Sequence, residues 1–120
     1  MEVNLRDCSS LVDIPSSMNH LDKLKDLDLQ GCRNIGSLPS PIAWRSLEKL
    51  CLRKCSKLSS FPKIECLDAL KKLDMSDCIT LRSLPSSIWE LESLKDLKLD
   101  GCSNLENLSK STESPQSSRS

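Results

Sequence analysis

Seven cysteines carry the most reactive side chains of this 120-residue chain. A thiol can form a disulfide, bind a metal or act as a nucleophile. The odd number of cysteines, and an N-terminal stretch that lacks the pattern of a signal peptide, favour reduced thiols. No Cys-x-x-Cys pair occurs, and the two closest thiols, Cys51 and Cys55, are four residues apart. That spacing gives a zinc site little support, so we expect neither a metal nor a cofactor.

The other reactive residue types are too few to assemble a familiar catalytic site. The sequence has one histidine, His20, no tyrosine and three glycines, so neither a histidine-based triad nor a glycine-rich phosphate loop can be written. Seventeen basic and seventeen acidic residues balance, which argues against nucleic acid as the main partner. No apolar run reaches the length of about 18 residues that a membrane span needs. We therefore expect a protein that is not an enzyme and has no small-molecule substrate.

Five of the cysteines recur at a regular spacing, which is the strongest signal in the sequence. They are separated by 24, 23, 23 and 24 residues, and four prolines keep the same period. The repeating positions are Cys8, Cys32, Cys55, Cys78 and Cys102, and Pro15, Pro39, Pro62 and Pro85. With the leucines in register, the unit reads LxxLxLxxCxxLxxLPxxI. A period of about 20–50 residues indicates a solenoid.

Physical constraints on one unit predict how the units assemble. The LxLxx segment alternates as a short strand does, and the rest is too short for a long crossover helix. One unit cannot bury its leucines alone, so neighbours must complete the core. We expect an α/β fold over residues 1–108: a solenoid of about five 23–24-residue units with a parallel concave β-sheet. Short 3₁₀, helical or irregular segments should form its convex side.

The solenoid arrangement makes further predictions about individual residues. Leu27, Leu50, Leu73 and Leu97 should lie on adjoining strands. The five repeating cysteines should be buried near free carbonyls of the turn, with redox or metal chemistry as the alternative. Trp44 should belong to the convex core, whereas Trp89 falls out of register and is a candidate contact residue. The serine-rich residues 109–120 should be a disordered tail, and the uncapped ends suggest a fragment of a longer protein.

The repeats resemble a known family. Segments such as Leu27–Cys32 and Leu97–Cys102 fit the phrase LKxLDLxGCxxLxxLPxxI. That phrase is similar to the leucine-rich repeats of plant intracellular immune receptors, especially the Toll/interleukin-receptor-type nucleotide-binding disease resistance proteins. Cysteine in place of the asparagine of other repeats, and the lack of LxGxIP, distinguish it from plant cell-surface receptors.

The resemblance implies a function in protein recognition. In that family the repeats sense pathogen effectors or host proteins that effectors modify, and they restrain the nucleotide-binding domain. It implies a cytoplasmic or nuclear protein of innate immunity whose partner is a protein, with no nucleic acid and no membrane. Nucleotide binding is not carried over, because this chain has no such domain. Two alternatives are a generic cytosolic leucine-rich repeat scaffold and the substrate-binding arm of a ubiquitin ligase.

The resemblance places the binding residues at the outward positions of LxLxx. In this chain these are Asp26, Asp28, Gln30, Lys49, Cys51, Arg53, Lys72, Asp74, Ser76, Asp96, Lys98 and Asp100, with Glu2, Asn4 and Arg6 in the opening unit. Stacked in columns, they give a basic centre at Lys49, Arg53 and Lys72 between acidic edges. Three neighbouring pairs have opposite charges: Asp26 and Lys49, Lys72 and Asp96, and Asp74 and Lys98. These charges either recognise a partner or serve only solubility.

Overall fold

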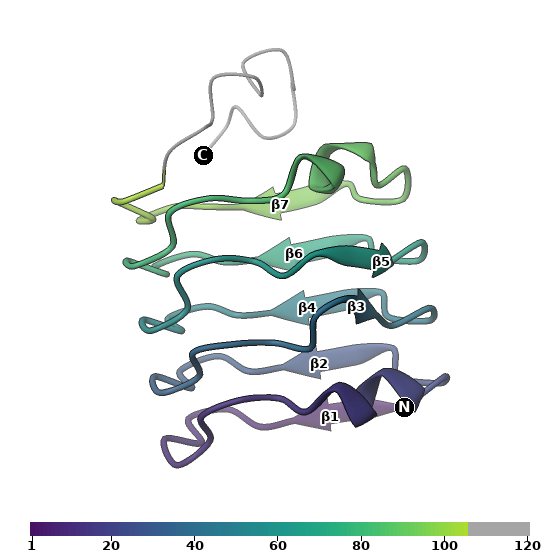
Figure 1. Ribbon diagram of the computed structural model, residues 1–120, viewed down its shortest axis with the longest axis horizontal. Coiled ribbons are helices and arrows are strands. Elements are labelled where there is room, and N and C mark those ends of the chain that lie inside the picture. Colours follow the sequence, from purple (N-terminus) through teal and green to yellow (C-terminus); the bar gives the residue numbers. More distant parts are fainter. Residues whose placement is uncertain (106–120) are drawn as a thin grey trace.

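Five short parallel strands, one per repeat, form the main sheet of the computed structural model (Figure 1), which describes residues 1–105. In spatial order they are β1 (Glu2–Asn4), β2 (Asp26–Asp28), β4 (Lys49–Cys51), β6 (Lys72–Asp74) and β7 (Asp96–Lys98). Sequence order and spatial order agree, so each unit lies beside the one before it. The expected tail, residues 109–120, and the last residues of the expected solenoid lie outside the described part of the chain.

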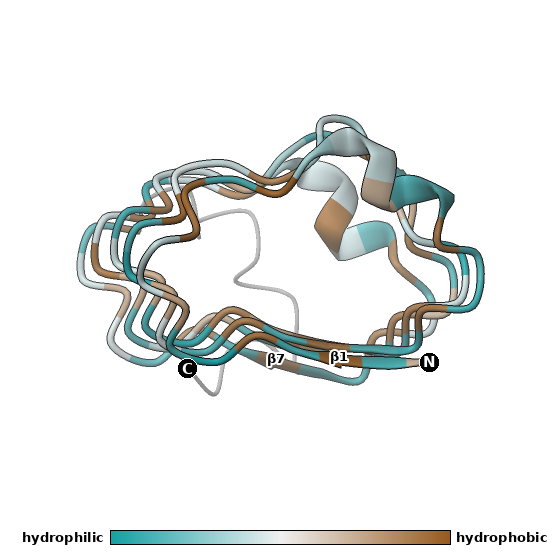
Figure 2. Cartoon of the chain, turned by 90° about the horizontal axis from the view of Figure 1, so that it is seen from below, coloured by the Kyte–Doolittle hydropathy of each residue, from teal (hydrophilic) through white to brown (hydrophobic). Residues whose placement is uncertain are grey.

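The register of the sheet aligns the repeats as their leucines predict. Leu27 pairs with Leu50, Leu50 with Leu73 and Leu73 with Leu97, and Val3 begins the same row. All four leucines are buried. Viewed along the stack (Figure 2), the units superpose as flattened rings, with the main sheet along one long side. The aliphatic side chains fill the space within the rings, and the predicted solenoid is confirmed.

Each convex segment adopts one of two conformations, according to the length of its unit. The 3₁₀ helices η1 (Ser16–His20) and η2 (Ser86–Glu90) lie in the two 24-residue units. The two 23-residue units instead contain β3 (Ile42–Ala43) and β5 (Ile64–Cys66), which pair in a second parallel sheet. A 3₁₀ helix advances about 2 Å per residue and a strand about 3.3 Å. The extra residue is therefore accommodated by winding the segment into a helix.

Trp44 fixes the convex segments to the core. Its side chain is fully buried, and its Nε1 donates a hydrogen bond of 2.9 Å to the carbonyl of Met18 in η1. Asn19 adds a second link, because its Nδ2 donates to the carbonyl of Pro41 and its Oδ1 accepts from the Ala43 amide. The expected core position of Trp44 is confirmed. Trp89 is half-buried against the same core, so it is less available for contacts than its position in the sequence indicates.

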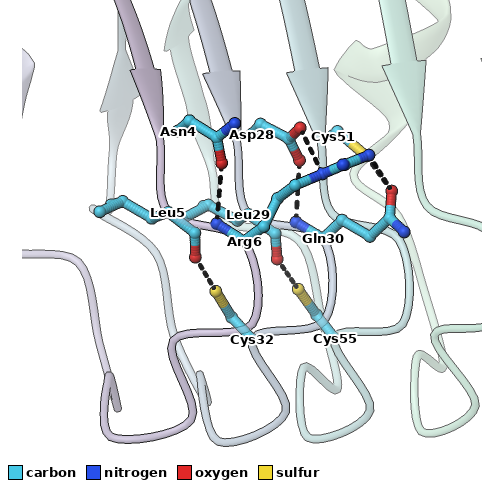
Figure 3. Close-up of polar contacts among 9 residues, drawn as sticks. All are labelled: Asn4, Leu5, Arg6, Asp28, Leu29, Gln30, Cys32, Cys51 and Cys55. Atoms are coloured by element: carbon cyan, nitrogen blue, oxygen red, sulfur yellow. Dashed lines mark hydrogen bonds and ion pairs between the residues drawn. The ribbon is translucent and has the colours of Figure 1, made fainter.

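The repeating cysteines form a ladder of hydrogen bonds from unit to unit. The thiols of Cys32, Cys55, Cys78 and Cys102 donate to the carbonyls of Leu5, Leu29, Leu52 and Met75, at 3.0–3.3 Å. Each acceptor belongs to the preceding unit, and Figure 3 shows the first two of these contacts. Each of these carbonyls also accepts the backbone amide of the cysteine in its own turn, so the thiol adds a second hydrogen bond that links neighbouring units. All seven cysteines are free thiols.

The residue before each repeating cysteine adopts a left-handed backbone conformation. Gly31 and Gly101 have φ values of 79° and 78°, and Asp7, Lys54 and Asp77 occupy the same position with φ near 60°. Glycine adopts this conformation without strain, whereas a side chain costs about 1–2 kcal/mol. At Gly31 an added Cβ would also lie 2.0 Å from Oδ1 of Asp7.

We expect Gly31→Ala to lower the free energy of unfolding by about 2 kcal/mol, measured by denaturant titration. Gly36→Ala is the matched control, because its Cβ would meet nothing within 4 Å; its effect should be neutral or stabilising by up to about 1 kcal/mol. Adding Asp7→Ala to Gly31→Ala should recover the part of the loss that comes from the collision. Equal losses at Gly31 and Gly36 would contradict this account of the turn.

Candidate protein-binding face

The outward positions of the sheet form the predicted columns. Along one row of the sheet, Glu2, Asp26, Lys49, Lys72 and Asp96 are register partners. The next row is Asn4, Asp28, Cys51, Asp74 and Lys98. Just beyond the strands, backbone hydrogen bonds from Gly31 to Arg53 and from Lys54 to Ser76 continue the stacking. The structure thus brings the predicted residues together on one surface, which we call the concave face.

Three residues of the second row also have a structural role that the sequence reading missed. A side-chain oxygen of Asn4, Asp28 and Asp74 accepts a hydrogen bond from the backbone amide two residues later, at 3.0–3.1 Å. Asn and Asp commonly make this local bond where a strand turns. Their spacing just before each turn is a signal that could have predicted it. One oxygen of each of these side chains is therefore engaged within the turn.

An ion pair crosses from the first unit to the second on this face. Arg6 Nε lies 3.0 Å from Oδ2 of Asp28, and its guanidinium also donates to Oε1 of Gln30 at 3.2 Å (Figure 3). The three expected pairs of opposite charge lie side by side in the register, but within residues 1–105 none of them approaches to 4.0 Å. Exposed pairs of this kind contribute about 0–1 kcal/mol. Apart from Asp74, whose Oδ1 accepts the Ser76 amide, these side chains are therefore free to reorganise around a partner.

Exposure separates the predicted residues into three groups. The exposed side chains are Lys49, Arg53, Lys72, Lys98 and Asp100, and the half-buried ones are Asp26, Asp28, Gln30, Cys51, Asp74 and Asp96. Ser76 is only 5% exposed, so the prediction that its side chain is available to a partner is wrong. Its short side chain lies between rungs that carry the longer side chains of Arg53 and Asp100. A partner at this point of the face would therefore contact Arg53 and Asp100 instead of Ser76.

The centre of the concave face is a shallow hollow of about 160 Å³. Lys49 and Lys72 are register partners across it, and Asp26, Asp28 and Asp74 line its sides. Two like charges directly opposite each other on a sheet repel. Both ammonium groups are exposed, and neither forms an ion pair with a carboxylate in the described part of the chain. An anionic group placed between them would relieve the repulsion.

Cys51 lies in the same hollow and is the thiol of the concave face. Burial raises the pKa of this thiol, and the nearby carboxylates of Asp28 and Asp74 raise it too. The thiol therefore stays protonated at neutral pH and contributes a small, weakly polar surface rather than a nucleophile. Within residues 1–105, no group of three or more His, Cys, Asp or Glu side chains is arranged to hold a metal ion.

Comparison with known proteins decides the family of this fold. A family model described as Leucine Rich Repeat matches residues 23–44. Disease resistance protein RPS6 of Arabidopsis thaliana is 37% identical over 96 residues, which cover 80% of this chain and 8% of the relative. The chain is a leucine-rich repeat region of the plant disease resistance type.

Two further relatives support this assignment of the leucine-rich repeat region. Disease resistance protein RPP4 of Arabidopsis thaliana is 41% identical over 48% of this chain and 5% of its own length. Protein SUPPRESSOR OF npr1-1, CONSTITUTIVE 1, from the same plant, is 34% identical over 87% of this chain and 7% of its own length. The leucine-rich repeat region thus spans less than a tenth of the curated relatives named here. None of the helices in residues 1–105 is long and apolar enough to cross a membrane.

Proposed function

We propose that the concave face is a protein-recognition surface of a plant disease resistance receptor that works in the cytoplasm or nucleus. Its partner is a pathogen effector, a host protein that an effector modifies, or the nucleotide-binding domain of the receptor itself. The similarity to RPS6 and RPP4 supports this function over a generic scaffold or the arm of a ubiquitin ligase. Repeat regions of such proteins generally mediate protein–protein contacts rather than catalysis.

The observation that carries the proposal is the pair of lysines at the centre of the face. Lys49 and Lys72 repel each other, are exposed, and lie above a hollow that includes apolar Leu50. Acidic side chains of a partner would bind between them, while the surrounding Asp26 and Asp74 would reject a partner with the wrong charge pattern. Complementary charges of this kind set specificity and association rate more than affinity.

Charge reversal at this centre tests the proposal. We expect Lys49→Glu/Lys72→Glu to weaken the partner at least about tenfold, which corresponds to about 1.4 kcal/mol, without unfolding the chain. The measurement is quantitative co-purification of the tagged chain with proteins of a leaf extract, followed by titration of each purified partner. Circular dichroism checks the fold of the variant.

The matched control is Lys63→Glu/Arg82→Glu, which makes the same change of net charge at two exposed positions outside the concave face. Partners of the face should be lost with Lys49→Glu/Lys72→Glu and kept with the control. Retention of every partner by the face variant at the level of the control would exclude this centre as the binding site.

A further inference from the structure

A second basic surface lies outside the hollow, on the turns that follow β2 and β4. We call Arg33, Arg53, Lys54 and Lys57 the turn patch. Residues 29–37 and 52–60 carry these four basic side chains and no acidic one. All four are exposed, and none forms an ion pair with an acidic side chain of residues 1–105. A chain with no net charge thus has a strong local excess of positive charge.

The two turns of the patch are stacked directly on each other. The Gly31 amide donates to the carbonyl of Arg53 at 2.8 Å, and the Cys55 thiol donates to the carbonyl of Leu29 at 3.3 Å. Acidic residues bound the patch on both sides: Asp7 in the preceding unit, and Asp77 in the following one. The turn patch therefore covers two units, or about two strand spacings of roughly 4.8 Å. Exposed Arg82 of the following unit adjoins it, since the Arg82 amide donates to the Ser59 carbonyl at 2.8 Å.

Lys54 departs from the backbone requirement of its position. It has a φ of 64°, in the left-handed region where Gly31 and Gly101 are unstrained. Asp7 and Asp77, at the same position of other units, belong to a residue type that tolerates this conformation. A lysine has no such local compensation, so its presence is costly to folding.

Lys57 replaces a residue that would link two units. At the equivalent position Asn34, Thr80 and Asn104 each donate a side-chain hydrogen bond to a carbonyl of the preceding unit, namely Ser9, Ser56 and Ile79. No such bond from Lys57 is found within residues 1–105, so the carbonyl of Arg33 lacks the side-chain donor that its counterparts receive. The turn after β4 thus lacks two stabilising features that other units have. Each of the two replacements, Lys54 and Lys57, adds a positive charge.

We propose that the turn patch binds a short acidic segment of a protein, with two or three carboxylates in extended conformation. Positions that break the local rules of a fold are often functional sites, where a loss of stability is offset elsewhere in the structure. A short segment fits because Asp7 and Asp77 would repel a longer polyanion at both ends. Single-stranded nucleic acid fits poorly, since residues 29–37 and 52–60 carry no aromatic side chain on which bases could stack. This site does not depend on Lys49 or Lys72.

The test is the variant Lys54→Gly/Lys57→Asn, which restores the residues found in neighbouring units. Binding of a fluorescein-labelled hexaglutamate peptide to the 120-residue chain is measured by anisotropy at low and at physiological salt. We expect the variant to unfold at a higher temperature than the parent chain and to bind the peptide about tenfold more weakly at low salt. All peptide titrations use the Lys49→Gln/Lys72→Gln background, which removes the centre of the concave face proposed above to bind acidic groups. In this background Lys63→Gln/Lys95→Gln, with the same charge change at exposed positions away from the turn patch, should change binding by less than about twofold.

Three results would overturn the proposal. The first is equal weakening in Lys54→Gly/Lys57→Asn and in Lys63→Gln/Lys95→Gln, which would mean that net charge alone matters. The second is a complete absence of peptide binding in the Lys49→Gln/Lys72→Gln background, which would assign the peptide to the concave face alone. The third is tighter binding of a labelled dT oligonucleotide than of hexaglutamate, which would indicate nucleic acid. A variant no more stable than the parent would remove the argument from lost stability, and with it the proposal.

Discussion

Raising the pH above about 9 should destabilise this chain steeply, because two of its buried thiols can ionise only when it unfolds. Burial raises the pKa of Cys78 to about 12 and also raises the pKa of Cys55 well above its ordinary value. The folded state therefore accepts the protonated thiol and rejects the thiolate. Its stability is complete below the thiol pKa of the unfolded chain, about 8.5, and declines as the pH rises toward the folded value.

The expected loss is large for a domain of this size. Each such thiol removes about 1.4 kcal/mol from the free energy of unfolding per pH unit, so two remove about 4 kcal/mol between pH 9 and 10.5. Denaturant titrations at several pH values, with reductant present, measure this slope. The chain has no tyrosine, so the ultraviolet absorbance of thiolate can be followed directly during alkaline unfolding.

The control for the alkaline transition is Cys55→Ala/Cys78→Ala. This variant starts from a lower stability because it lacks two rungs of the ladder, but its stability should depend much less on pH. A slope equal to that of the parent chain would show that other groups cause the alkaline unfolding. The slope, rather than the absolute stability, is the quantity to compare.

Trp44→Ala should lower the free energy of unfolding by about 3–5 kcal/mol. The side chain is fully buried between the convex segments and the sheet, so its removal leaves a cavity and also removes the hydrogen bond from Nε1 to the Met18 carbonyl. Equilibrium unfolding in urea, followed by circular dichroism, measures the effect. If the alanine variant proves too unstable to titrate, Trp44→Phe should still lose about 1–2 kcal/mol through the missing hydrogen bond and the smaller ring.

Trp89→Ala provides the comparison, because the second tryptophan is only half-buried. Its loss should be at most about 2 kcal/mol. This variant also leaves Trp44 as the single tryptophan, whose fluorescence then reports on the convex core alone. A larger effect at Trp89 than at Trp44 would contradict the packing described here.

Much of the architecture was predictable because the repeat constrains it at several positions at once. The leucines alternate with polar residues, and the same period separates Cys32 from Cys55. Together these two constraints permit one register, in which Leu27 pairs with Leu50 as observed. The burial of Cys32, Cys55, Cys78 and Trp44 followed from the same register. Cys8 and Cys102 were also expected to be buried, but they lie in the end units and are only partly buried. The choice between η1 and β3 on the convex side was not predicted, although the difference of one residue in unit length was visible in the sequence.

The concave face was predictable as a set of positions but not as a set of contacts. The period places Asp28 and Cys51 in one row, whereas the bond from Asp28 to a backbone amide depends on the turn geometry. The burial of Ser76 depends on the length of the side chains beside it, which a periodic pattern does not encode. The ion pair of Arg6 joins different columns, so a comparison along each column misses it.

The two conformations of the convex segments bear on the curvature of the array. Where β3 and β5 pair, the outer spacing approaches the strand spacing of the main sheet, and the stack is nearly flat. A 3₁₀ segment is bulkier than a strand, so it pushes neighbouring units apart on the outside and bends the array. Deletion of a single residue from a 24-residue unit is thus a means of straightening the array locally. Evolution could reshape the arc in this way while every side chain on the inner sheet remained in place.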